Sequence, residues 1–185
     1  MRSVVPPEIR NYLRMLDARL TKSTDLVVIG GAAVALGWDE HHATPDVDLF
    51  NHPGLEFQAA VAACHGSPGA IPIATVGIAS PPCDFEDRLT AVPLDGLRHL
   101  RVFIPEAHDL ALMKIVRGEA HDFDAVEDMH RVAPLSLATL IARYHETRIT
   151  LIGPESRLKV SFLALAARLF GEACADALGP TLDGP

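Results

Sequence analysis

Two aspartates separated by one residue, Asp46 and Asp48, have the residue types and spacing that most favour metal chemistry in this sequence. They belong to an alternating stretch, DVDLF, which predicts a strand over residues 46–50, and residues i and i+2 of a strand face the same side. Two neighbouring carboxylates repel each other unless a cation lies between them. Magnesium prefers carboxylates combined with substrate phosphates and retained waters, so we expect the pair to hold Mg²⁺ or Mn²⁺. Taken alone, the pair would also suit the solvated face of an edge strand.

A glycine pair, Gly30-Gly31, follows the apolar run Leu26–Ile29 and precedes the small residues Ala32–Leu36. The run predicts a buried strand, and the small residues predict a short helix. Glycines let the backbone approach a ligand, and unpaired N–H groups at a helix start suit a phosphate. A tight strand-to-helix turn would also explain the glycines, and the two interpretations are compatible. Together with the aspartate pair, this segment has the groups needed for phosphoryl or nucleotidyl transfer.

The elements that must position this segment change in type along the chain. The first half mixes strands and helices, with a helix from Pro6 to about Lys22, a helix over Leu55–Cys64, and strands over Ile71–Ala79 and Leu97–Ile104. Four helices are predicted afterwards, at residues 107–117, 121–131, 136–145 and 156–169. We therefore predict an α/β fold, a small mixed sheet with helices followed by a C-terminal helical part. Residues 1–105 would form the α/β core, 106–178 the helical part of the same domain, and 179–185 a disordered tail.

Composition narrows the class of protein. The formal charge is −8 and no basic cluster is visible, whereas general nucleic-acid binding requires a basic face. An acidic chain can still bind a small anion when metal ions supply the counter-charge. The three widely spaced cysteines indicate neither a disulfide framework nor a zinc knuckle. The sequence has no apolar stretch of about 18 residues, so we expect no membrane span. The N-terminus lacks a signal-peptide pattern, and we therefore expect a cytoplasmic protein.

Four stretches in a fixed order carry a resemblance to a known family. They are Gly30-Gly31, the segment HATPDVD at residues 42–48, DLALMK at residues 109–114, and His121-Asp122. Over about residues 26 to 130 this order resembles the nucleotidyltransferase superfamily, and within it small bacterial proteins related to the AbiEii-type toxins of toxin–antitoxin systems. The resemblance implies a nucleotidyltransferase-type fold and metal-dependent transfer of a nucleoside monophosphate from an NTP. The acceptor, whether protein, RNA or small molecule, stays open, and an antitoxin protein is a candidate partner.

The resemblance also implies roles for individual residues. Asp46 and Asp48 would hold the metal, and Gly30 and Gly31 would bind phosphate. Lys114, on an exposed helix face, would neutralise charge at the triphosphate. Asp122 would position a substrate group, and His121 would contact a phosphate or transfer a proton. Thr44 would either hydrogen-bond locally before Pro45 or place its hydroxyl near the metal or phosphate.

The sequence departs from the family pattern at three places. Arginines of the pattern are replaced by His42 and His121, and Ile73–Ala79, where a third carboxylate is expected, holds no acid. Asp84 is the candidate for that carboxylate, with Glu86 and Asp87 nearby. An alternative function is therefore a non-catalytic nucleotide-binding or protein-interaction module with a degenerate site. Another is a toxin–antitoxin component whose partner completes the site.

Overall fold

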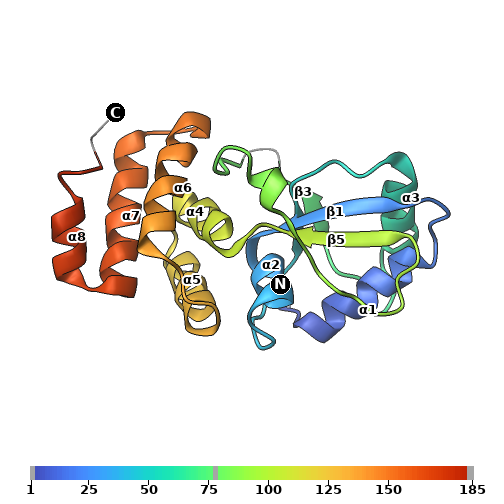
Figure 1. Ribbon diagram of the computed structural model, residues 1–185. Coiled ribbons are helices and arrows are strands. Elements are labelled where there is room, and N and C mark those ends of the chain that lie inside the picture. Colours follow the sequence, from blue (N-terminus) through green and yellow to red (C-terminus); the bar gives the residue numbers. More distant parts are fainter. Residues whose placement is uncertain (1–2, 77–78, 183–185) are drawn as a thin grey trace. The chain divides into compact units, whose positions relative to one another are not determined.

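The computed structural model describes residues 3–76 and 79–182, and the chain forms two compact units (Figure 1). The first, called here the sheet unit, comprises residues 1–77 and 88–105. The second, called the helical unit, comprises residues 78–87 and 106–185.

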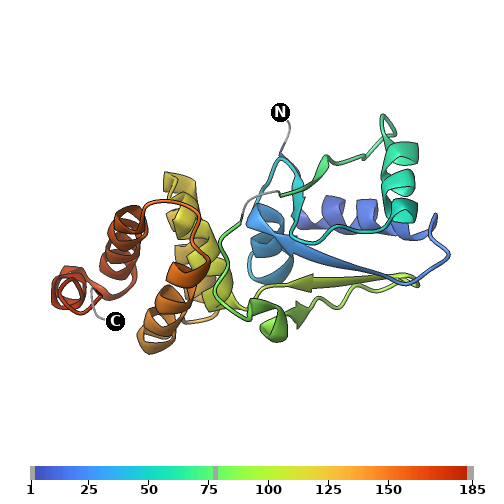
Figure 2. The ribbon, with the colours of Figure 1, turned by 90° about the horizontal axis from the view of Figure 1, so that it is seen from above.

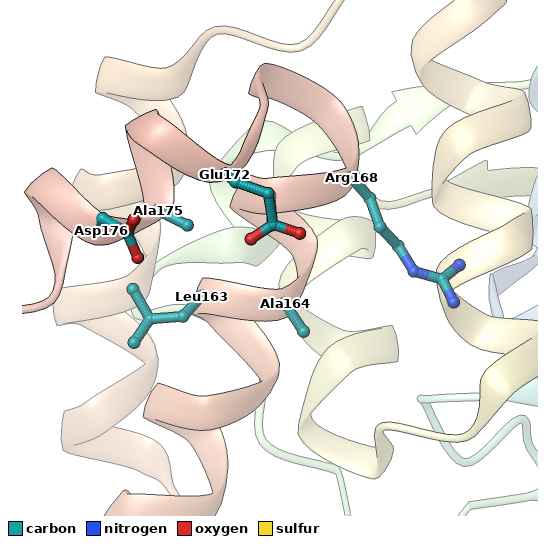
Figure 3. A pocket seen from close by; sticks show the side chains of 7 residues that line it. Leu163, Ala164, Arg168, Glu172, Ala175 and Asp176 are labelled. Atoms are coloured by element: carbon teal, nitrogen blue, oxygen red, sulfur yellow. The ribbon is translucent and has the colours of Figure 1, made fainter.

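The sheet unit contains a mixed five-stranded sheet in the order β3-β2-β1-β5-β4. Strand β1 is parallel to β5 and antiparallel to β2, β3 is parallel to β2, and β4 is antiparallel to β5. Strands β1 and β5 lie side by side in both views (Figures 1 and 2). The elements are α1 (Pro6–Asp17), β1 (Thr24–Ile29), α2 (Gly30–Gly37), β2 (Val47–Leu49), α3 (Leu55–Cys64), β3 (Ile73–Thr75), β4 (Thr90–Ala91) and β5 (Leu100–Ile104). The prediction of a small mixed sheet with helices is confirmed.

The burial of the central strands follows the apolar pattern that predicted them. The last four residues of β1 are buried, as a continuous apolar run requires. In β2, Val47 and Leu49 are buried and Asp48 is partly exposed, so the alternation of DVDLF places this carboxylate on the wetter face. The pairing register joins Ile29 to Asp48. The strand residue that precedes the glycine pair therefore lies directly opposite one of the two predicted metal ligands.

The first helix is shorter than predicted and ends in an anchored carboxylate. Helix α1 ends at Asp17 instead of near Lys22, because the next residues form a turn closed by the hydrogen bond from Leu20 N–H to the Asp17 carbonyl. The buried Asp17 carboxylate accepts hydrogen bonds from the backbone N–H groups of the three residues 98–100, at 2.7 to 3.1 Å. This contact ties the end of α1 to the start of β5.

The helical unit packs five α-helices around a core that includes Tyr144 and Phe162, whose rings lie 4.8 Å apart. A short 3-10 helix, η1 (Phe85–Arg88), lies where the chain passes between the two units. The five helices are α4 (Ala107–Arg117), α5 (Ala120–Val132), α6 (Leu137–Thr150), α7 (Glu155–Phe170) and α8 (Glu172–Leu178). The four predicted C-terminal helices are thus found, and α8 was not predicted. Helix α8 lies against α7 (Figure 1).

Three further predictions concern particular segments. The predicted strand over Ile71–Ala79 is observed only at Ile73–Thr75, and its residues 77–78 lie outside the described residues. Of the predicted tail, residues 183–185 also lie outside them, while Leu182 is buried. The three cysteines, Cys64, Cys83 and Cys174, form no disulfide in the described part of the chain. Within residues 3–76 and 79–182, the helices are too short or too polar to cross a membrane.

Candidate functional site

The glycine pair forms the first turn of α2, immediately after the buried strand β1. Gly30 has a φ of +68°, in the left-handed region that side chains with a Cβ rarely adopt. A Cβ at Gly30 would lie 2.9 Å from Oδ2 of Asp48, and a Cβ at Gly31 would lie 2.6 Å from Oγ1 of Thr44. Both approaches are shorter than real Cβ contacts. The left-handed backbone therefore favours glycine at position 30, and the buried Thr44 side chain favours it at position 31.

The aspartate pair lies on the segment that faces this turn. Asp48 is in the middle of β2, opposite Ile29, so its carboxylate stands beside Gly30. Asp46 lies just before β2 and is partly exposed. A carboxylate held against a glycine turn, with a second carboxylate two residues away, fits the oxygen ligands that a hard divalent cation prefers. The donor set of the sheet unit is thus compatible with Mg²⁺ or Mn²⁺.

Thr44 is buried, with 4% of its surface exposed, and the local one of its two predicted contacts is observed. Its hydroxyl donates a hydrogen bond to the backbone carbonyl of Asp46 at 3.3 Å, which is the local interaction expected before Pro45. The same hydroxyl is the atom closest to the missing Cβ of Gly31. Its backbone pairs with Val4 through two hydrogen bonds of 2.7 and 3.0 Å. The structure therefore brings Gly30, Gly31, Thr44 and Asp48 together.

A second cluster of predicted residues lies in the helical unit, around Asp122. The Asp122 carboxylate is fully buried and accepts two hydrogen bonds from Arg117, from Nε at 2.7 Å and from Nη2 at 2.5 Å. Nζ of Lys114 lies 3.5 Å from Oδ1 of the same carboxylate, and Nε2 of His121 lies 3.8 Å from it. Burial raises the pKa of Asp122, but the hydrogen bonds from Arg117 and the positive charge of Lys114 outweigh burial and hold this pKa below its ordinary value. The structure thus groups three of the predicted site residues.

The expectation that Lys114 occupies an exposed helix face is wrong. Only 4% of its surface is exposed, because its ammonium group turns toward the buried carboxylate of Asp122. A buried lysine requires such a partner, since an unpaired charge away from water is strongly unfavourable. Lys114 is therefore an internal ion-pair partner in the helical unit.

Arg117 is the residue of this cluster that the sequence prediction missed. It ends α4, and Gly118 follows in the left-handed conformation with φ +69°. This glycine reverses the chain, so that the guanidinium at the end of α4 meets a carboxylate in the first turn of α5. A sequence signal for this pair was present. The arginine is followed directly by a glycine, and an aspartate comes four residues after that glycine, at the start of a new helix.

Asp84, the candidate third carboxylate, is an exposed residue with φ +54° in the helical unit. The strand β3 that pairs with β2 consists of Ile73, Ala74 and Thr75, so it contributes no acid beside Asp48. The role of Asp84 stays a prediction, and so do the substrate roles of the Asp122 cluster.

Comparison with known proteins identifies the family. A family model described as a nucleotidyltransferase of unknown function (DUF6036) matches residues 8–168. This range includes both the glycine turn with its aspartates and the Asp122 cluster. Neither curated proteins nor solved structures gave a match. Since the family model covers most of the sequence, the chain belongs to this family of nucleotidyltransferases.

Proposed function

We propose that this protein is a metal-dependent nucleotidyltransferase that moves a nucleoside monophosphate from an NTP to an acceptor. Membership of the family supports nucleotidyltransferase activity in general. The observation that supports a metal site most directly is the 2.9 Å approach of Asp48 Oδ2 to the position of a Gly30 Cβ. Glycine adopts this left-handed backbone without strain, and its missing Cβ leaves room for the acidic side chain to stand against the turn.

In this proposal the sheet unit holds the metal and the phosphates. Asp46 and Asp48 bind Mg²⁺, which when bound supplies positive charge against the phosphates of the nucleotide. Gly30 and Gly31 bring backbone N–H groups of the first turn of α2 close to a phosphate, because those groups have no partner within the helix. The Thr44 hydroxyl borders the same turn. The work of these residues is to position the reacting groups and neutralise charge, which dominates catalysis of phosphoryl transfer.

Roles for the helical unit follow from the family pattern. We propose that His121 contacts the triphosphate and that Asp84 is the third carboxylate. Lys114 and Asp122, which the pattern also selects, are buried and paired with each other, so either would reach a substrate only when that pair opens. Because Lys114 is partnered by Asp122, variants of either residue need a stability measurement before a change in nucleotide affinity is interpreted.

Calorimetry with Mn²⁺ tests the metal site. The double variant Asp46→Asn and Asp48→Asn is expected to abolish binding, because it removes both proposed ligands. The matched control is the double variant Asp25→Asn and Asp95→Asn, which makes the same change of net charge in the sheet unit. Asp25 forms an ion pair with Arg101, and Asp95 is exposed. Equal Mn²⁺ affinity of the site variant and the wild-type protein would refute the proposed ligands.

A second test compares alanine substitutions at two glycines that share a left-handed backbone, Gly30 with φ +68° and Gly66 with φ +77°. Gly30→Ala is expected to abolish Mn²⁺-dependent nucleotide binding, because its Cβ would collide with Asp48. A Cβ at Gly66 would meet no atom within 4 Å, so Gly66→Ala has similar backbone strain without the collision. Gly66→Ala should therefore bind as the wild-type protein does. If both variants bind equally well, the close approach at Gly30 has no role in the site.

A screen of the four NTPs with Mg²⁺ or Mn²⁺ separates the enzyme from its alternative. The absence of an acid on β3 favours the alternative, a nucleotide-binding or interaction module with a degenerate site. An enzyme releases pyrophosphate when an acceptor is present, for example in a cell extract, and the Asp46→Asn and Asp48→Asn double variant does not. A degenerate module binds NTP without releasing pyrophosphate under any of these conditions.

The most specific part of the proposed function is a role in a toxin–antitoxin system. We propose that the chain resembles the bacterial AbiEii-type toxins in activity, with an antitoxin protein as its partner. Expression of the wild-type protein in a bacterial host is then expected to arrest growth. The metal-site double variant, expressed at the same level, should permit growth. Growth arrest by both proteins would indicate toxicity unrelated to nucleotidyl transfer.

A further inference from the structure

His42 stands at the same turn as the glycine pair, although the sequence pattern assigned it no role. A Cβ at Gly31 would lie 3.4 Å from Nε2 of His42, in addition to its contact with Thr44. The space beside the α carbon of residue 31 is thus taken up by an imidazole nitrogen and a hydroxyl. The hydroxyl donates its one hydrogen to the carbonyl of Asp46, whereas an imidazole N–H group can donate a hydrogen bond to a phosphate oxygen.

The backbone around His42 is held in place on both sides. Its N–H group donates a hydrogen bond to the carbonyl of Asp39 at 3.1 Å, and two residues later Thr44 is paired with Val4. A carboxylate oxygen of Asp39 also lies within 4.8 Å of a ring nitrogen of His42. The imidazole is partly buried. A side chain restrained in this way loses less conformational entropy when it binds a ligand than one on a free loop.

Charge distinguishes His42 from the other side chains at the turn. The side chains that border the two glycines most closely are those of Asp48, Thr44 and His42. Of these three, only His42 can carry a positive charge. A triphosphate carries about four negative charges, of which one divalent cation offsets two. A donor that can become cationic therefore has a clear use beside the glycine turn.

We propose that His42 is a phosphate-binding residue of the nucleotide site, donating from Nε2 to a phosphate oxygen over Gly31. This inference rests on the proposed function, because it places the nucleotide's phosphates at the glycine turn. It makes the site recognise the triphosphate and not the base. The contribution of His42 is therefore the same for all four NTPs and extends to a triphosphate without a nucleoside.

Calorimetry with Mg²⁺ complexes of the four NTPs and of inorganic tripolyphosphate tests the inference. His42→Ala is expected to weaken binding of all five ligands by a common factor of about 10 or more, the effect of losing a hydrogen bond to a charged group. His42→Gln retains an N–H donor at similar reach and should recover most of the affinity. The matched control is His41→Ala, which removes the neighbouring, exposed histidine. The control should bind every ligand as the wild-type protein does.

The outcomes separate this inference from the proposed function. If the wild-type protein binds Mn²⁺ and NTP but His42→Ala binds all five ligands with unchanged affinity, the role of His42 is refuted and the proposed function stands. Loss of affinity for a single NTP would show that His42 contacts a base, which also refutes the inference. If the wild-type protein binds no NTP, both proposals fail. Unchanged Mn²⁺ affinity of His42→Ala, together with recovery by glutamine, excludes a merely structural effect.

Discussion

Both compact units bury an aspartate, and they stabilise its negative charge in different ways. In the sheet unit, Asp17 is 2% exposed and receives backbone N–H groups of residues 98–100. In the helical unit, Asp122 is fully buried and is paired with the side-chain cations of Arg117 and Lys114. Burial raises the pKa of each carboxylate, and in each case the hydrogen bonds outweigh burial and lower it. The same ionised state is thus reached with neutral backbone dipoles in one unit and with full charges in the other.

The difference determines what remains when the carboxylate is removed. Around Asp17, removal leaves neutral N–H groups, which cost moderate free energy when they are buried without an acceptor. Around Asp122, removal takes away a carboxylate that pairs with the buried ammonium of Lys114 and with Arg117. A buried charge that loses a counter-charge is much less favourable than an unsatisfied amide. The helical unit should therefore be the more sensitive of the two to loss of its carboxylate.

The largest expected effect is that of Asp122→Asn. This change should reduce the free energy of unfolding by about 3–5 kcal/mol, the usual cost of breaking a buried ion pair by removing one partner. Urea unfolding at pH 7, followed by circular dichroism, measures the loss. The control is Asp124→Asn on the same helix, whose pair with Arg168 lies at the surface and should contribute about 0–1 kcal/mol. Equal losses in both variants would contradict the comparison.

A smaller effect is expected for Asp17→Asn. The amide retains an acceptor oxygen but places an N–H₂ group among backbone donors, so the free energy of unfolding should fall by about 1.5–3 kcal/mol. The exposed Asp95 of the same unit provides the control, and Asp95→Asn should change stability by less than about 0.5 kcal/mol. A loss larger than that of Asp122→Asn, in the same urea experiment, would reverse the order proposed for the two units.

Lys114→Met should have a still smaller effect by itself, about 1 kcal/mol. Asp122 keeps both hydrogen bonds from Arg117, and methionine keeps an apolar side chain in the buried space. The double variant Lys114→Met and Asp122→Asn sharpens the comparison. It should be more stable than Asp122→Asn alone, because the buried ammonium that faced the lost carboxylate is also gone. If the two losses simply add, the cost of Asp122→Asn does not arise from Lys114.

The smallest expected effect is on the pH dependence of stability. Because the folded-state pKa values of Asp17 and Asp122 are below the ordinary 3.8, both carboxylates contribute full stability above that pH. The contribution is lost as the pH falls through the lower folded values, so only its beginning is seen between pH 5 and about 3.5. Urea unfolding over this range should show a decline in the wild-type protein that is shallower in each asparagine variant. A decline that is steeper in a variant than in the wild-type protein would contradict the lowered pKa values of these carboxylates.

Local patterns predicted much of the fold and of the candidate site. The apolar run before Gly30 predicted β1, and the alternation around Asp48 predicted the partly exposed face of β2, because period and burial are local properties. The motifs also selected Lys114 and Asp122, and in the structure Nζ of Lys114 lies 3.5 Å from Oδ1 of Asp122. The short strand β4 and helix α8 were missed, since two or seven residues carry little periodic signal.

The sequence by itself determined the order of the elements, the need for glycine before the aspartate strand, and the residue types available for metal and phosphate binding. Only the tertiary structure decided that Lys114 is buried and that His42 borders Gly31. It also showed that the carboxylate of Asp17 receives N–H groups from the first residue of β5 and the residue before it, about 80 residues away. These contacts depend on distances between segments that are remote in the chain or separated by a turn. Hydrophobic periodicity predicts which face of a helix or strand is buried. It does not predict which polar group of another element contacts that face.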